Sequence, residues 1–219
     1  MIPQRYTEGV AVLIGGGPSL TAQQVSLCMN PHQQRRLAVM GCNDAYRICP
    51  FLDVLYAADE RWIDYHQQNV LKSAHLRTLE CWTPDEKAAE KYSEWSLIGI
   101  KPIEPGLSTD RAVLHGGNHS GYQLINLAYL MGCLDIILIG YDGHSGGDHW
   151  FGKHPEGPMN IKSNYQRWMA GYRSIQKQAA ALNLTIVNAT PGSAIDAFPH
   201  ATLDDALYGL RRRYGDGSG

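Results

Sequence analysis

The sequence has few of the features that mark secreted, membrane-spanning or zinc-binding proteins. Its 219 residues include five cysteines, an odd number with no C-x-x-C pair, which fits neither a disulfide framework nor a zinc knuckle. No apolar run approaches the roughly 18 residues of a membrane span, and the N-terminus lacks the apolar core of a secretory signal. We therefore expect a soluble, cytoplasmic protein with no membrane partner.

An excess of either charge is also missing. Lys and Arg number 19 against 21 Asp and Glu, a formal net charge of −2, which does not favour nucleic acid as a partner. The hydrophobic content of 44% is enough for a core, so we predict one domain over residues 1–210. The one basic cluster, Arg211 to Arg213, begins a basic and Gly-rich tail over residues 211–219, read as solvated or, alternatively, as a phosphate contact. The oligomeric state is left open.

Short apolar runs alternate with helical patterns, which is typical of a doubly wound α/β fold with a mostly parallel sheet and helices on both faces. The expected strands are residues 10–14, 37–40, 54–57, 76–81, 136–139 and 185–187. The expected helices are residues 21–29, ending before Pro31, 60–70 and 85–92 on the surface, 120–131, and 162–182. Capping boxes are predicted at Thr21 and Ser120. The stretch 93–110 has no clear period and is expected to be a loop or lid.

A glycine-rich turn follows the first expected strand and leads into a helix. In Gly15, Gly16, Gly17, Pro18 and Ser19, glycine would let a phosphate approach the chain, and the helix start would offer free amides to an anion. The turn matches neither G-x-G-x-x-G nor a Walker loop, so NAD and P-loop chemistry lose support. It predicts a nucleotide site, with a tight turn needing glycine only for its conformation as the alternative.

Further polar candidates fall where the strands are expected to end, the edge at which open α/β sheets bind ligands. Asn43 would contact a ribose or base, and Asp59 a hydroxyl or Mg²⁺; the alternatives are a turn Asn and a helix N-cap Asp. A second Gly-rich helix start supplies the candidates Asn118, Ser120 and Gly121. The segment after the last expected strand supplies Thr190 and Ser193, with a Pro-Gly turn that binds no ligand as the alternative.

The most unusual segment follows the strand at 136–139. Three histidines and two aspartates fall within 13 residues, beginning at Asp142. Histidine can exchange a proton near neutral pH, so His149 or His154 is the candidate general base. The alternatives are a merely polar loop and a metal site, although no recognised metal-ligand spacing is present.

Several of these blocks resemble a known superfamily: residues 15–20 (GGGPSL), Cys42-Asn43, Ser120-Gly121, and the stretch 128–142 ending in IGYD. They resemble the Campylobacter-type bacterial sialyltransferases and the archaeal 6-hydroxymethylpterin diphosphokinase-like proteins. Residues 144–160 and 188–193 also look like small phage and prophage proteins of that group, in which case the location would be the host cytoplasm.

The resemblance implies a Rossmann-like fold whose nucleotide lies beside the positions that match the family motifs: Gly16, Gly17, Ser19, Asn43, Ser120 and Gly121. In the sialyltransferases the ligand is CMP-sialic acid, and a histidine after the Asp142-like position is the base. His154 matches that histidine better than His149 does. The sequence departs from the family pattern where Gly16 replaces Asn and Gly143 replaces a tyrosine-bearing segment.

These observations predict a glycosyltransferase that moves a sugar from a nucleotide donor, CMP-type among the options, to a hydroxyl acceptor. Asn43 and Asp142 would orient the donor, the amides of residues 15–19 would stabilise the leaving phosphate, and His154 would take the proton. One alternative is a pyrophosphokinase using ATP and Mg²⁺ held by Asp59 and Asp142. Another is a non-catalytic nucleotide-binding or phage accessory protein.

Overall fold

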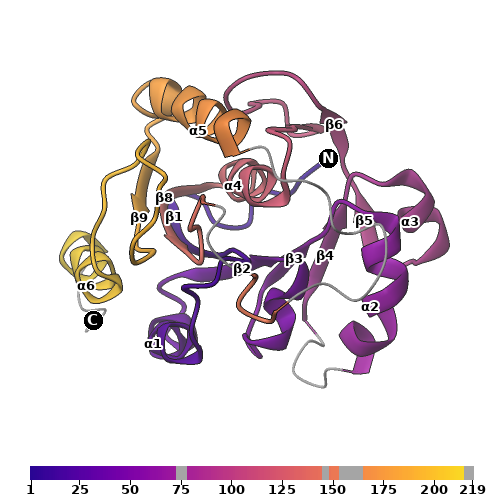
Figure 1. Cartoon of the computed structure of the whole chain (residues 1–219), viewed down its shortest axis with the longest axis horizontal. Coiled ribbons are helices and arrows are strands. Elements are labelled where there is room, and N and C mark those ends of the chain that lie inside the picture. The colour runs from indigo at the N-terminus through magenta and orange to yellow at the C-terminus, as the bar shows by residue number, and fades with distance from the viewer. Residues whose placement is uncertain (73–77, 145–147, 153–164, 215–219) are drawn as a thin grey trace.

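Seven strands form a single parallel sheet at the centre of the computed structural model, which describes residues 1–72, 78–144, 148–152 and 165–214 (Figure 1). The strand order is β5-β4-β3-β2-β1-β8-β9, and every neighbouring pair is parallel. The strands are β1 Gly9–Ile14, β2 Ala38–Cys42, β3 Val54–Tyr56, β4 Glu80–Thr83, β5 Trp95–Leu97, β8 Cys133–Ile139 and β9 Thr185–Asn188. The expected α/β fold is confirmed.

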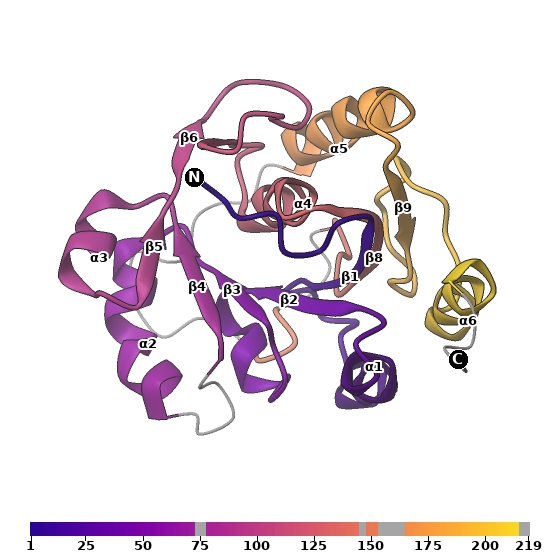
Figure 2. The same ribbon diagram turned by 180° about the vertical axis from the view of Figure 1, so that it is seen from behind.

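Helices cover both faces of the sheet, as the front and back views show (Figures 1 and 2). They are α1 Ala22–Gln33, α2 Glu60–Lys72, α3 Glu86–Lys91, α4 Ser120–Leu130, α5 Tyr165–Ala179, α6 Leu203–Tyr214 and the 3-10 helix η1 Asn43–Arg47. Strand β1 is buried on both sides: Ala11 and Leu13 pack with α4 and α5, while Val10 and Val12 pack with α1, α2 and α6. Continuous apolar sequence is typical of a strand covered in this way.

The stretch 93–110 is more regular than a loop, so that expectation is wrong. It contains β5, in which Trp95 is buried and pairs with Cys81 at the edge of the main sheet. It also contains β6 Gly99–Lys101, which pairs with β7 Val113–His115 in a separate two-stranded sheet. Each of these strands has three residues, too few to display an alternating pattern.

Two helix expectations need correction, while the capping box at Thr21 is confirmed. Helix α1 continues through Pro31 to Gln33, because proline near the C-terminal end removes only one of the last hydrogen bonds. Helix α4 is capped by the side chain of His119, and Ser120 is its first residue. Helix α2 lies on the surface, as expected, with one face exposed and the other buried through Trp62, Ile63, His66, Gln67 and Val70.

The basic cluster Arg211 to Arg213 lies within α6, which keeps the chain helical to Tyr214. The boundary at residue 210 stays a prediction. The five cysteines are buried as free thiols. Among the described residues, no helix combines the length and apolar character needed to cross a membrane.

The strand order reverses at β1. The chain builds β2 to β5 on one side of β1 and then places β8 and β9 on the other. At such a point the connections after the two adjacent strands diverge, and open α/β sheets bind their ligands in the crevice between them. This topology puts the candidate site beyond Ile14 and Ile139, where β1 and β8 end side by side.

Candidate functional site

The connections that follow β1 and β8 are in direct contact. The Gly15 N–H donates to the Ile139 carbonyl oxygen at 2.9 Å, and the Gly17 N–H donates to the Gly140 carbonyl oxygen at 2.8 Å. A Cβ atom at Gly15 would lie 2.4 Å from the Gly140 oxygen. Glycine at this position therefore allows two backbone segments to meet at the reversal of the sheet.

Asp142 reaches from the β8 side to the start of α1. Its Oδ1 accepts the Ser19 N–H at 3.2 Å, and its Oδ2 accepts the Ser19 hydroxyl at 2.9 Å. The side chain is buried, with Asp142 5% exposed. A Cβ atom at Gly17 would lie 1.7 Å from Asp142 Oδ2, so the carboxylate lies where any other residue would project its side chain. Asp142 thus ties the two connections together.

These contacts narrow the role expected of the glycine-rich turn. The amides of Gly15, Gly17 and Ser19 are already used within the chain, and Pro18 has none. The Gly16 N–H is the amide of this turn that no hydrogen bond among the described residues engages. A phosphate at the turn would meet one backbone donor, with the Asp142 carboxylate close by.

Thr190 and Ser193 support this arrangement from the connection after β9. The Thr190 hydroxyl accepts the Tyr141 N–H at 2.9 Å, and the Ser193 hydroxyl donates to the Tyr141 carbonyl at 2.6 Å. Both hydroxyls are therefore engaged with the backbone beside Asp142. The structure brings them to the expected edge, where they hold the chain that carries Asp142.

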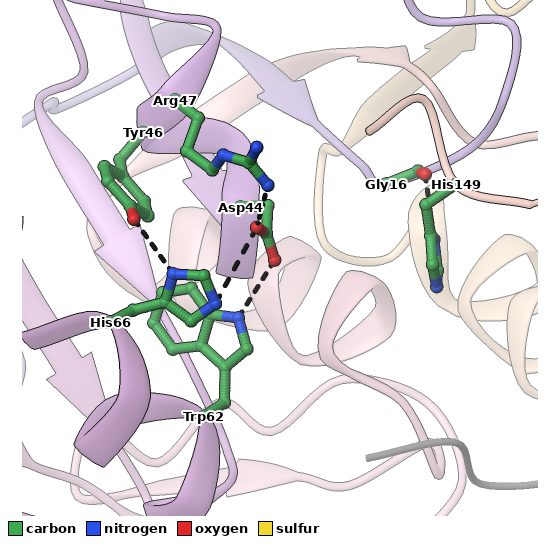
Figure 3. Close-up of polar contacts among 7 residues, drawn as sticks. All are labelled: Gly16, Asp44, Tyr46, Arg47, Trp62, His66 and His149. Carbon is green, nitrogen blue, oxygen red and sulfur yellow. Dashed lines mark hydrogen bonds and ion pairs between the residues drawn. The ribbon is translucent and has the colours of Figure 1, made fainter. Parts of the chain in front are cut away.

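The His149 hairpin, residues 148–152, lies against the glycine-rich turn. The Gly16 carbonyl oxygen lies 2.9 Å from His149 Nδ1 (Figure 3). It also lies 3.3 Å from the Trp150 amide nitrogen. A carbonyl can only accept, so His149 Nδ1 carries a proton, and in the neutral ring Nε2 is the unprotonated nitrogen. A general base at this position would therefore act through Nε2. His154, the first candidate for that role, lies outside the described residues.

The second Gly-rich helix start and the end of β2 adjoin the same edge. The Tyr141 hydroxyl donates to the Gly121 carbonyl at 3.1 Å, which places Asn118, Ser120 and Gly121 beside the connection after β8. Asn43 opens η1 with a φ of 49°, directly after Cys42, whose thiol lies 3.7 Å from the Ile14 carbonyl oxygen. The expected residues from β1, β2, β8, β9 and α4 therefore share one edge of the sheet.

Asp59 lies apart from this group, at the end of β3. Its carboxylate accepts the Arg61 backbone N–H at 2.9 Å and pairs with the Arg61 guanidinium at 3.0 Å. The hydrogen bond from the Arg61 side chain lowers the pKa of Asp59. Three strand spacings, about 14 Å, separate β3 from β8, so Asp59 follows a strand well apart from the one that leads to Asp142. Among the described residues, no three His, Cys, Asp or Glu side chains form a group suited to a metal.

A buried polar cluster lies beside Asn43 and was not predicted (Figure 3). Asp44, 2% exposed, accepts from the Trp62 indole N–H at 3.0 Å and from Arg47 at 2.9 Å. His66 stacks on Trp62 with ring centroids 4.4 Å apart, and its Nδ1 lies 2.9 Å from the Tyr46 hydroxyl. Burial and the Asp44 charge raise the pKa of Tyr46. The cluster therefore places the Asp44 carboxylate and the Arg47 guanidinium next to the candidate site.

His119 gives the fold a dependence on pH. Its Nδ1 accepts the Tyr122 N–H at 3.3 Å as the cap of α4, and its ring packs against Trp168 with centroids 4.6 Å apart. Burial lowers the pKa of His119 to about 3. In the unfolded chain the same imidazole takes a proton near pH 6.5. The unfolded state then binds more protons between these two values, so stability falls as the pH falls through that window.

We expect His119→Asn to remove this dependence while keeping a capping side chain. Lowering the pH from 6.5 to 5.0 should cost the natural chain about 1–2 kcal/mol more than it costs the variant. Urea unfolding of both proteins at the two pH values measures the difference. Equal losses in the two proteins would contradict the role of His119.

The fold and the edge residues together define a doubly wound α/β protein with a candidate ligand site at its topological switch point. No family model and no curated protein matches the chain. Among solved structures it is similar to the sialyltransferase CstII from Campylobacter jejuni, in complex with a substrate analogue, cytidine-5′-monophosphate. The two are 12% identical with a TM-score of 0.55, over 90% of this chain and 86% of that one. The resemblance to sialyltransferases that the sequence predicts is therefore confirmed for the fold.

Proposed function

We propose that this chain is a nucleotide-sugar-dependent glycosyltransferase that binds its donor at the edge formed by the ends of β1, β2 and β8. The observation that carries the proposal is the likeness to CstII over 90% of this chain, since that protein is a sialyltransferase described with a cytidine nucleotide. The meeting of Gly16, Asn43 and Asp142 at the switch point supports the location. Cytidine is accordingly the first donor nucleoside to test.

The reaction uses groups of this chain at defined places. The acceptor hydroxyl oxygen forms a bond to the anomeric carbon of the sugar, the bond from that carbon to the phosphate oxygen breaks, and the nucleotide leaves with the electron pair. His149 Nε2 takes the acceptor proton, because Nδ1 donates to the Gly16 carbonyl. The Gly16 N–H faces the leaving phosphate, and Asn43 orients the ribose or base. His154, the first candidate from the sequence, lies outside the described residues and stays the alternative base.

Nucleotide binding is tested by thermal unfolding in EDTA with CMP, CDP, UDP, GDP, ADP, ATP and their sugar conjugates. At ~100 times its dissociation constant, a ligand of the folded state adds about 2.7 kcal/mol, which is roughly 5–10 °C here. We expect this shift with a cytidine nucleotide and without metal. Release of the nucleotide from the matching sugar donor then measures turnover, and His149→Ala should lower it.

A matched pair of variants locates the binding site. Asn43 and Asn183 both adopt left-handed backbone, with φ of 49° and 51°, and Asn183 lies in the turn between α5 and β9. Glycine keeps that conformation at either position and removes the side chain. Asn43→Gly should weaken the nucleotide shift, whereas Asn183→Gly should leave it unchanged. Equal shifts in both variants would place the nucleotide elsewhere.

Other outcomes of the same panel would replace the proposal. Stabilisation by ATP only when Mg²⁺ is present would favour a pyrophosphokinase. Nucleotide binding that survives without any turnover, and that His149→Ala leaves intact, would favour a non-catalytic nucleotide-binding protein. No shift with any nucleotide would remove the basis for a donor site.

A further inference from the structure

Arg47 connects the buried polar cluster to the His149 hairpin. Its guanidinium carbon lies 5.5 Å from the ring centroid of Phe151 and 5.8 Å from that of Trp150. Both distances fall in the range in which a cation is attracted to an aromatic ring. Arg47 comes from η1, after β2, and the hairpin comes from the connection after β8, so this contact spans the switch point.

The position of the guanidinium is fixed from below. Arg47 Nη1 donates to Asp44 Oδ1 at 2.9 Å, and the other Asp44 oxygen is held by the Trp62 indole N–H at 3.0 Å (Figure 3). The Asp44 side chain is buried, whereas 44% of the Arg47 side chain is exposed. Because a buried carboxylate is stable only with a partner, the hydrogen bond to Asp44 holds the Arg47 guanidinium in place. The same guanidinium lies next to the aromatic rings of the hairpin.

Phe151 contacts both Arg47 and His149, so the hairpin links these two residues. The rings of His149 and Phe151 are nearly parallel, at 8° with centroids 4.9 Å apart, and the same His149 ring bonds to Gly16 through Nδ1. We propose that Arg47 is a positioning residue which, anchored on Asp44, holds the aromatic rings of the His149 hairpin and so keeps the His149 imidazole on the Gly16 carbonyl. Its part in catalysis rests on the proposed function, whereas its part in holding the hairpin does not.

Arginine suits this position better than lysine. The planar guanidinium can bond to a carboxylate at its edge and lie over aromatic rings with its face, whereas an ammonium group is a point charge. Lysine at residue 47 would keep the charge near Asp44 and lose the planar face. We therefore expect Arg47→Lys to lie between the natural chain and Arg47→Met in every measurement below.

The test follows the hairpin directly through its phenylalanine. The chain has three phenylalanines, Phe51, Phe151 and Phe198, so labelling with 4-fluorophenylalanine gives three fluorine resonances, and Phe151→Leu assigns the one of interest. In Arg47→Met, the Phe151 resonance should move toward that of an exposed fluorophenylalanine while the buried Phe198 resonance stays. Because Arg47→Met leaves Asp44 without its cation, the double variant Asp44→Asn/Arg47→Met, which removes both charges, is measured as well.

Lys91→Met is the matched control. Lys91 also pairs with a carboxylate, Asp64 at 2.8 Å, and also lies over an aromatic ring, Tyr92 at 5.2 Å, but on α3. It should leave the Phe151 resonance and turnover unchanged. In Arg47→Met we expect kcat to fall at least tenfold with the donor KM within about twofold, and Arg47→Lys to recover part of kcat.

The two parts of the proposal fail separately. An unmoved Phe151 resonance in both Arg47→Met and the double variant would overturn the role of Arg47 in holding the hairpin. A moved resonance with kcat within twofold of the natural enzyme would overturn its role in positioning His149 for the reaction. If the natural chain shows no turnover with any donor, the proposed function fails, and the fluorine result still decides whether Arg47 holds the hairpin.

Discussion

Asp44→Ala lowers the free energy of unfolding by about 2–4 kcal/mol, the largest single effect that we expect. The carboxylate is buried and accepts from both Arg47 and the Trp62 indole N–H. Its removal leaves the buried indole N–H without an acceptor, whereas the Arg47 side chain is 44% exposed, so water compensates part of the loss of its partner. For a chain of this length the melting temperature should fall by roughly 4–16 °C.

Urea unfolding of Asp44→Ala and of Asp64→Ala provides the comparison. Asp64 also pairs with a cation, Lys91, but the side chains are 37% and 51% exposed, so Asp64→Ala should cost less than about 1 kcal/mol. Adding Arg47→Met to Asp44→Ala should recover part of the loss, because it removes the orphaned cation. A cost for Asp44→Ala as small as that for Asp64→Ala would contradict the importance of the buried carboxylate.

Gly17→Ala is the second large effect, and it acts on the switch point itself. The added Cβ atom would lie 1.7 Å from Asp142 Oδ2 and 2.7 Å from the Gly140 carbonyl oxygen. Either the carboxylate leaves Ser19 or the two connections separate, and we expect a loss of about 1–3 kcal/mol in unfolding free energy. Nucleotide binding should weaken as well if the donor lies at this edge.

Gly209→Ala controls for the substitution. Gly209 lies in α6 with nothing within 4 Å of its added Cβ atom, so alanine should stabilise the chain there by about 0.5–1 kcal/mol. Asp142→Ala combined with Gly17→Ala should cost less than the sum of the two single variants, because it vacates the space that the new methyl group needs. Strict additivity would show that the two side chains do not compete.

The central strands could be predicted from the sequence because each carries its own local signal. Residues 10–14 and 136–139 are continuous apolar runs with β-branched residues, as a strand buried on both faces requires, and they correspond to β1 and β8. Strands β5 and β6 have three residues each and little apolar pattern, since Ser96 and Leu97 are exposed at the edge of the sheet. Their pairing depends on neighbours that are remote in the chain, which no local pattern records.

The candidate site was predictable in location but not in its contacts. Glycine-rich turns after strands predicted residues that the structure brings to one edge of the sheet, where β1 and β8 end. However, Asp142 bonds to Ser19 across 123 residues and His149 to Gly16 across 133, and no spacing in the sequence reveals such pairs. One overlooked signal was local: Trp62 and His66 lie four residues apart and therefore share one face of α2.

The reactivity of the five buried cysteines would report local unfolding of the protein. Burial raises the pKa of Cys28, Cys42, Cys49 and Cys81 to about 12 and raises that of Cys133 as well. Since the thiolate is the reactive form, a thiol reagent at neutral pH modifies these residues only as fast as the surrounding core exposes them. Cys28 and Cys133 belong to the two separate cores on opposite faces of the sheet. Their relative modification rates would therefore show which helical layer lifts off first.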